Sequence, residues 1–282
     1  MSSDDSPPDS PSVARKVREP IFDAPLVVVA LVAFLVLVYA LVSSGSAQTE
    51  DAIVARFAFI PGRLTLALWP ARLGDLLAGA NLDPQALQQA AMLRHYSALA
   101  GGAEVWTLLT YAFLHGSWSH VGLNAIWIVA FGPPVARRLG APRFLALFAA
   151  TAIAGALVHW AFNMMDFTPL IGASAADSGL MAAATRFVFE PGGPLGAPGG
   201  YSRALTQVDY SVPAPPLRQL LRERRVVIFL VIWLATNFIF GAGAQSFGLS
   251  EAPVAWLAHI GGFAVGLLLF PLFDRAAPPV TR

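Results

Sequence analysis

Long apolar stretches alternate with polar connections along this chain, and the apolar stretches are long enough to be membrane helices. A helix needs about 20 apolar residues to cross a bilayer. Residues 24–44 reach this length without a single charged side chain. Five further stretches follow it, at residues 117–136, 144–165, 169–189, 226–244 and 252–273. The pattern predicts an all-α membrane protein with a bundle of six transmembrane helices.

Composition agrees with a membrane as the solvent. Of the 282 residues, 56% are hydrophobic and 12% are charged, whereas a soluble domain carries about 25% charged residues. The net charge of +1 leaves no basic face large enough for a nucleic acid partner. The sequence has no cysteine, so disulfides and thiolate metal sites are excluded.

The distribution of basic residues predicts the orientation. Lys and Arg near the spans mark the cytoplasmic side, and 14 of the 18 fall on one side, which is also the side of both termini. The first span resembles a signal peptide because basic residues precede it, but its apolar run is longer than a signal peptide needs. We therefore interpret it as a retained anchor. The expected location is a bacterial inner (plasma) membrane, with both termini in the cytoplasm.

Connections and tails divide the chain further. Residues 1–20 are rich in Ser, Asp and Pro and are predicted to be a disordered cytoplasmic tail. The membrane domain is expected over residues 21–275, and residues 276–282 form a C-terminal tail. Within the domain, residues 45–104 form a long outer loop with short apolar pieces suited to the bilayer interface. Residues 190–225, rich in Pro and Gly, are expected to be a flexible cytoplasmic loop.

Polar side chains recur at one depth of the predicted bundle. His120 and Asn124 lie early in the second span, Ser174 early in the fourth and His259 early in the sixth. These three spans run from outside to inside, so the residues lie roughly 5–12 Å below the outer end. Polar residues inside a membrane are costly and usually functional. Ordinary hydrogen bonding between helices is the alternative explanation, and it accounts poorly for the whole set.

Small residues predict that the fourth and sixth spans approach each other closely. They recur at steps of four, which lets two helix backbones come into contact. The rows are Ala175, Gly179 and Ala183 in the fourth span and Ala258, Gly262 and Gly266 in the sixth. Packing alone explains the glycines, but the same contact makes an interaction between Ser174 and His259 feasible.

Three motifs occur in order in the second, fourth and sixth spans. They are His120-Val-Gly-Leu-Asn124, Gly172-Ala-Ser174 and Ala258-His259-Ile-Gly-Gly262. Together with the run from Trp106 to His120, they resemble the rhomboid family of intramembrane serine proteases. The resemblance covers about residues 100–273.

The resemblance implies a six-helix rhomboid-like bundle with a water-filled cavity open to the outer side. It implies a catalytic dyad of Ser174 and His259 without an aspartate. It also implies an oxyanion site made by His120, Asn124 and the backbone N–H of Ser174. No cofactor and no metal are implied. The expected partners are the lipid bilayer and transmembrane protein substrates, whose peptide bonds are hydrolysed in or near their transmembrane segments.

Two positions depart from the family pattern. Ala175 replaces the usual glycine after the serine, and Thr107 replaces the arginine that usually follows the loop tryptophan. Ala175 favours an alternative in which the protein is weakly active or inactive and binds membrane clients without cutting them. Thr107 raises the question of how the outer loop is anchored.

Several polar residues keep alternative roles. Asp177 is either a third member that orients His259 or a group that is neutral or hydrogen-bonded within the bundle. His115 is expected to support the loop entering the second span, and His159 and Asn163 share a face of the third span. A transporter with a proton path through His159, Asp177 and His259 would need discontinuous helices or repeated halves, which the sequence lacks. A metalloprotease is disfavoured because there is no H-E-x-x-H motif.

Overall fold

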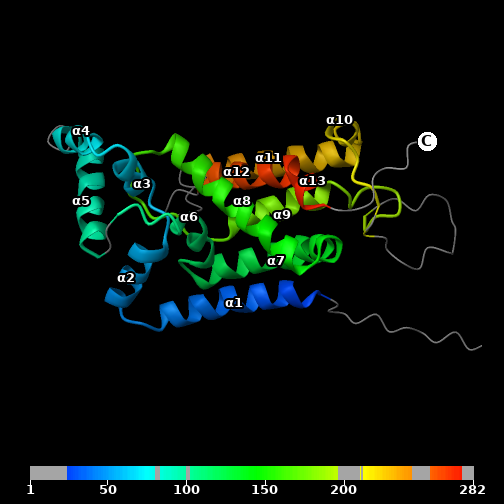
Figure 1. The fold of residues 1–282 in the computed structure, drawn as a ribbon, viewed down its shortest axis with the longest axis horizontal. Coiled ribbons are helices and arrows are strands. Elements are labelled where there is room, and N and C mark those ends of the chain that lie inside the picture. Colours follow the sequence, from blue (N-terminus) through cyan, green and yellow to red (C-terminus); the bar gives the residue numbers. More distant parts are fainter. Residues whose placement is uncertain are drawn as a thin grey trace, which may run out of the picture.

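The described chain is mostly helical, in line with the predicted all-α class (Figure 1). The computed structural model describes residues 24–79, 83–99, 102–195, 210, 212–242 and 255–274. In these ranges the only β pairing is an isolated antiparallel bridge between Phe59 and Leu170. The predicted tails at residues 1–20 and 276–282 lie outside the described residues, as does much of the predicted cytoplasmic loop.

A helix lies within or close to each of the six predicted spans. These helices are α1 (Leu26–Ser43), α7 (Trp118–Leu139), α8 (Ala141–Phe162), α9 (Ser174–Thr185), α11 (Arg224–Ala242) and α12 (Trp256–Leu268). Among the described residues, α1 and α8 are long and apolar enough to cross a membrane by length and composition alone. For the other four, crossing the bilayer stays a prediction.

The predicted outer loop is largely helical. It contains α2 (Ala47–Phe57), α3 (Pro61–Leu68), α4 (Arg72–Gly79) and α5 (Pro84–Leu99), and the short α6 (Thr107–Thr110) and η1 (Tyr111–Phe113) lead from it to α7. Local signals explain the helix starts, since Ser46 caps α2 by accepting a hydrogen bond from the Thr49 N–H and Pro61 opens α3. These helices gather at one end of the bundle, on the left in Figure 1.

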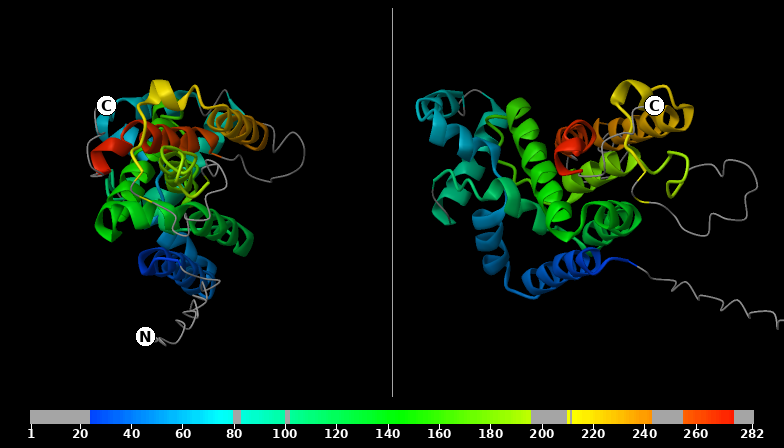
Figure 2. Two further views of the ribbon diagram at one scale, coloured as in Figure 1. Left: turned by 90° about the vertical axis from the view of Figure 1, so that its right-hand side faces the viewer. Right: turned by 45° about the vertical axis from the view of Figure 1, so that its right-hand side comes forward.

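The opposite end of the bundle holds both ends of the described chain. There α1 begins, and there lie α10 (Leu217–Leu220) and α13 (Phe270–Phe273). Two views in Figure 2 place α1 at one edge of the bundle beside α7. At another edge α11 packs on α12. The centre is α9, which contacts α7, α8 and α12 and buries every residue from Ala175 to Thr185.

Glycines allow α9 and α12 to approach as the small-residue rows predicted. A Cβ at Gly262 would overlap the carbonyl oxygen of Ala175, and one at Gly266 would overlap the backbone of Gly179. Where α8 meets both of these helices, a Cβ at Gly155 of α8 would lie 2.5 Å from the Cβ of Ala175. The methyl group of Ala175, which departs from the family pattern, therefore occupies space that Gly155 leaves open.

This fit predicts a measurable packing cost for Gly155→Ala. The new methyl group would meet the Ala175 Cβ at 2.5 Å and the Ala258 carbonyl oxygen at 2.8 Å, and we expect overpacking to lower the free energy of unfolding by about 1–3 kcal/mol. Adding Ala175→Gly should restore part of the loss. Gly122→Ala is the matched control, because its Cβ would enter open space. Unfolding of the purified protein in detergent measures the effect, and equal stability of Gly155→Ala and Gly122→Ala would contradict it.

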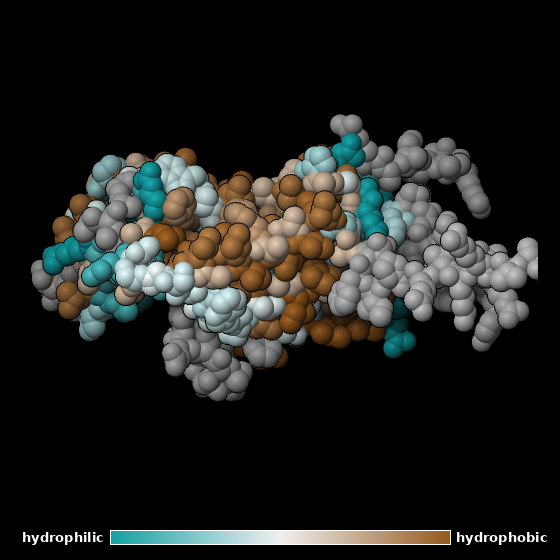
Figure 3. Space-filling view, turned by 90° about the horizontal axis from the view of Figure 1, so that it is seen from below, coloured by the Kyte–Doolittle hydropathy of each residue, from teal (hydrophilic) through white to brown (hydrophobic). Residues whose placement is uncertain are grey.

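The surface carries a hydrophobic band between two more polar ends. In Figure 3 the brown residues gather over the middle of the bundle, and teal residues are more frequent towards both ends. Large apolar side chains are exposed along the helices, among them Leu37 of α1 at 55% and Val231 of α11 at 59%. Such a continuous apolar surface on a folded chain indicates a membrane environment.

Ion pairs with buried Glu104 tie α2 and α3 to the segment that precedes α6. The Glu104 carboxylate lies 2.6 Å from the guanidinium of Arg56 and 2.6 Å from that of Arg63. Arg56 also stacks on Trp106, with its Cζ 4.6 Å from the ring centroid. Thr107 donates hydrogen bonds to the Glu104 carbonyl oxygen from its hydroxyl and its backbone N–H. Arginines of α2 and α3 thus supply the positive charge that position 107 lacks.

We expect Glu104→Gln to destabilise the protein strongly. The side chains of Glu104 and Arg63 are 1% and 6% exposed, so removing the carboxylate leaves the buried guanidinium of Arg63 without its anionic partner, at a cost of about 3–5 kcal/mol. Arg72→Ala is the control, since its pair with Asp75 is 3.9 Å long and exposed and such pairs contribute about 0–1 kcal/mol. Thermal unfolding in detergent compares the two, and a Glu104→Gln protein as stable as Arg72→Ala would disprove the anchor.

Candidate active site

Ser174 is the first residue of α9, at the end of a loop that the backbone holds in place. Leu170 exchanges two backbone hydrogen bonds with Phe59, at 2.8 and 3.2 Å. Gly172 donates its N–H to the Tyr111 carbonyl oxygen at 3.0 Å, and its φ of +112° is one that side-chain-bearing residues rarely adopt. These contacts attach the segment before Ser174 to the predicted outer loop and to η1.

His259 contacts Ser174 directly. Its Nε2 lies 2.8 Å from the Ser174 Oγ, within hydrogen-bonding distance. The two residues come from α12 and α9, the pair of helices that the glycine contacts bring together. A serine hydroxyl beside an imidazole is the arrangement by which a base activates an oxygen nucleophile.

Asn237 of α11 completes the surroundings of the imidazole. Its Oδ1 lies 2.7 Å from the His259 Nδ1, and its Nδ2 donates to the Trp256 carbonyl oxygen at 3.4 Å. Asn237 is not among the residues predicted from sequence. The sequence nevertheless carries a signal, because Asn237 is an amide within an otherwise apolar span, where polar residues are usually functional.

His120 and Asn124 lie beside the loop that precedes Ser174. A Cβ at Gly172 would lie 2.6 Å from the His120 Nε2 and 3.6 Å from the Asn124 Nδ2. Asn124 is buried, and its Nδ2 donates to no other group in the described part of the chain. The N–H groups of a first helical turn also have no acceptor within their helix, which applies to Ser174. Potential hydrogen-bond donors therefore surround the start of α9.

His115 lies in the loop before α7 and contacts His120. Its ring lies edge-on to that of His120, with centroids 5.0 Å apart. Burial and the nearby His120 lower the pKa of His115 to about 4, so this histidine is neutral at physiological pH. A neutral ring against His120 is consistent with the supporting role expected for His115.

The other polar candidates lie outside this contact network. Asp177 is buried, and both of its carboxyl oxygens lack a hydrogen-bond partner among the residues described. The His259 Nδ1, which Asp177 would contact as a third member, is bonded to Asn237 instead. Asn163 donates to the His159 carbonyl oxygen at 2.9 Å and thereby closes the end of α8. Within the described ranges, no group of three His, Cys, Asp or Glu side chains could hold a metal ion.

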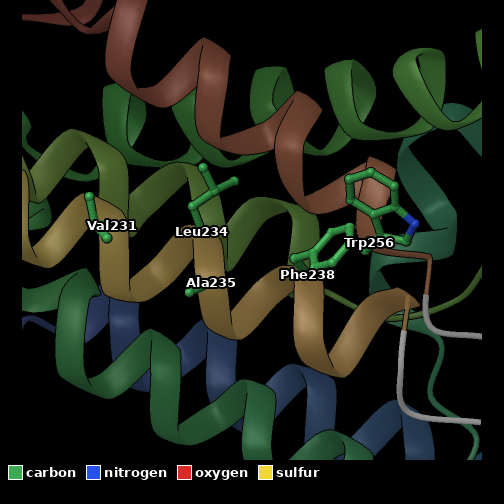
Figure 4. Close-up of a pocket in the computed structure, with 5 residues that line it drawn as sticks. All are labelled: Val231, Leu234, Ala235, Phe238 and Trp256. Atoms are coloured by element: carbon green, nitrogen blue, oxygen red, sulfur yellow. The ribbon is translucent and has the colours of Figure 1, made fainter. Parts of the chain in front are cut away.

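An apolar groove runs along the exposed face of α11 (Figure 4). It has a volume of about 410 Å³ and is lined by Val231, Leu234, Ala235 and Phe238 of α11 and by Trp256 at the start of α12. Asn237 is adjacent to Phe238 in sequence but is buried, with 9% of its surface exposed. The helix that contributes the amide thus presents hydrocarbon on its other side.

A family model of the rhomboid domain matches residues 102–193 and 204–275, which is more than half of the chain. The chain belongs to the rhomboid family. The matched segments of this rhomboid include all four residues predicted from sequence, and also Asn237. The family is membrane-embedded, which agrees with the apolar helices α1 and α8.

Curated relatives are distant and longer than the matched segments. The rhomboid protease GlpG of Serratia proteamaculans (strain 568) is 25% identical over 166 residues, covering 59% of this chain and 47% of that protein. The putative rhomboid protease YdcA of Bacillus subtilis (strain 168) is 33% identical over 85 residues, 30% of this chain and 42% of that protein. Rhomboid-related protein 3 of Homo sapiens is 35% identical over 82 residues, 29% of this chain and 20% of that protein. This rhomboid therefore spans less than half the length of each of the three.

Proposed function

We propose that this rhomboid is an intramembrane serine endopeptidase that hydrolyses peptide bonds in or near the transmembrane segments of other membrane proteins. The observation that carries the proposal is the 2.8 Å contact between the Ser174 Oγ and the His259 Nε2. Two relatives named as rhomboid proteases support it. In this proposal Ser174 is the nucleophile and His259 is the general base.

The proposed reaction proceeds in two steps. In acylation, the Ser174 Oγ attacks the scissile carbonyl carbon while its proton passes to the His259 Nε2. The C–N bond then breaks, and the same proton leaves with the amine. In deacylation, water attacks the ester, gives a proton to Nε2, and the released Ser174 oxygen takes it back as the acid departs. A weak hydroxyl nucleophile needs such a base at hydrogen-bonding distance.

The oxyanion of each tetrahedral intermediate needs hydrogen-bond donors. We assign this role to His120, Asn124 and the Ser174 backbone N–H. The support is the position of both side chains against Gly172 and the uncommitted Asn124 Nδ2. One such donor typically lowers the barrier by about 3–4 kcal/mol.

The proposal includes six membrane crossings with both termini in the cytoplasm of a bacterium. It places the end of the bundle that holds α2–α6 on the outer side. His120, Asn124, Ser174 and His259 all lie in the first two turns of their helices, at that end. Water needed for deacylation would therefore enter from the outer surface over a short distance.

A mapping experiment tests the proposal on the unaltered protein. The purified rhomboid in liposomes is treated with a fluorophosphonate, and the modified peptide is identified by mass spectrometry. We expect modification at Ser174 and none at Ser178, whose hydroxyl is engaged with the Ser174 carbonyl oxygen at 2.8 Å. The same liposomes should cleave a transmembrane substrate. If neither modification nor cleavage occurs, the proposal is wrong and the alternative of a protein that binds membrane clients without cutting them is favoured.

A further inference from the structure

The helix α11 buries few of its residues, and one of them is an amide. Of the positions from 224 to 239, only Val226 and Asn237 are buried. They are eleven positions apart, about three helical turns, and so lie on the same face. Most of the other side chains of the helix are exposed, as Val231 and Leu234 are. An amide costs free energy when it leaves water without partners, so Asn237 at this position requires an explanation.

The partners of Asn237 determine which way its amide points. Its Nδ2 lies 3.4 Å from the carbonyl oxygen of Trp256, which can only accept a hydrogen bond. The reverse orientation would place two oxygens against each other. The Oδ1 is therefore the atom at 2.7 Å from the His259 Nδ1. Since an amide oxygen only accepts, Nδ1 must carry the proton.

We propose that Asn237 is a positioning residue that holds His259 in the tautomer protonated at Nδ1, with the lone pair of Nε2 directed at the Ser174 hydroxyl. This inference rests on the proposed function and adds a third residue to its dyad. The hydrogen bond also fixes the rotation of the imidazole ring about its Cβ–Cγ bond. When Nε2 takes the serine proton, both ring nitrogens become donors, and the Asn237 Oδ1 still accepts from Nδ1.

A neutral amide suits this position better than a carboxylate does. In a membrane bundle an ionised side chain is expensive to bury. The buried carboxyl group of Asp177 forms no hydrogen bond with His259, whose Nδ1 is bonded to Asn237. The amide also uses its second function to attach α11 to the start of α12. Orientation of the base and attachment of the helix are thus two separable roles of one side chain.

Two substitutions separate these roles. Asn237→Asp keeps an acceptor for the His259 Nδ1 but loses the donor to Trp256, and Asn237→Leu has a similar volume but loses both. We expect Asn237→Leu to lower kcat by about 10- to 100-fold with KM little changed, which is less than the roughly 10⁴-fold cost of a misdirected imidazole in soluble triads. Asn237→Asp, which keeps the acceptor, should lose less activity than Asn237→Leu. The assay is cleavage of a transmembrane substrate in liposomes.

A spectroscopic measurement makes the inference independent of cleavage. Nitrogen NMR of ¹⁵N-histidine-labelled protein, with the His259 signals assigned by their loss in a His259→Gln variant, reports which ring nitrogen is protonated. We expect protonation at Nδ1 in the wild type and in Asn237→Asp, and a mixture of tautomers in Asn237→Leu.

Each outcome has a distinct meaning. Unchanged kcat and tautomer in Asn237→Leu would overturn the positioning role. Equal losses in Asn237→Leu and Asn237→Asp, with the Nδ1 tautomer retained in both, would assign the amide to helix attachment and also overturn it. If Ser174→Ala cleaves as the wild type does, the proposed function fails, while the tautomer shift in Asn237→Leu still decides the role of Asn237.

Discussion

Replacing Ser174 with alanine is expected to abolish cleavage while leaving the fold intact. The substitution removes the Ser174 Oγ, which lies 2.8 Å from the His259 Nε2. Loss of a serine nucleophile lowers kcat by roughly 10⁴-fold or more. The stability cost is one hydrogen bond, about 1 kcal/mol. Cleavage of a transmembrane substrate in liposomes and thermal unfolding in detergent measure the two effects.

A second serine of the same helix provides the control. Ser178 lies one turn further along α9 and bonds to the backbone, so Ser178→Ala should keep both cleavage and fluorophosphonate modification. Comparison of membranes from cells that carry the wild type or Ser174→Ala should also show released ectodomains only with the wild type. Cleavage by Ser174→Ala at the wild-type rate would remove Ser174 from the mechanism.

Replacing His259 with glutamine is expected to have an effect almost as large. Glutamine keeps a polar side chain near Ser174 but cannot take up its proton, and removing the base of such a site typically costs about as much as removing the nucleophile. We expect both cleavage and fluorophosphonate modification of Ser174 to fall by roughly 10⁴-fold or more. Modification is the more informative measurement, because it needs the activated hydroxyl but no bound substrate.

The matched control is a histidine away from the site. His95 of α5 is half-exposed and lies 3.6 Å from Asp51. In the His95→Ala variant, the fluorophosphonate should therefore modify Ser174 as fast as in the wild type. A His259→Gln protein that is folded and modified at the wild-type rate would show that another group activates Ser174.

The helices of the bundle were predictable because their signal is long and local. Each apolar run extends over several turns, and the observed α1 and α7 begin within about two residues of the predicted starts. The spacing of small residues also predicted the contact between α9 and α12 correctly. The helices of the outer loop were not predicted, because short apolar pieces such as residues 57–60 and 64–69 carry too few turns to show a period.

The candidate site was predictable where residues belong to motifs and unpredictable where partners are distant in sequence. Ser174 and His259 belong to recognisable sequence motifs. Asn237 is a single polar residue in the apolar helix α11, and the sequence of α11 does not reveal which face of the helix is buried. The Glu104 anchor was missed for a similar reason, since its partner Arg56 is 48 positions away. The contact between Gly155 and Ala175 depends on how α8 packs against α9. The spacing of residues within one helix does not determine that packing.

The pairing between Phe59 and Leu170 has a consequence for how this protein can change. The link uses main-chain groups only, as does the bond from the Gly62 N–H to the Asp166 carbonyl oxygen. Side chains of α2 to α5 can therefore diversify during evolution without loosening the segment that leads to the serine. Proline at position 59 would remove a donor from this link, so it is a substitution that selection should purge there.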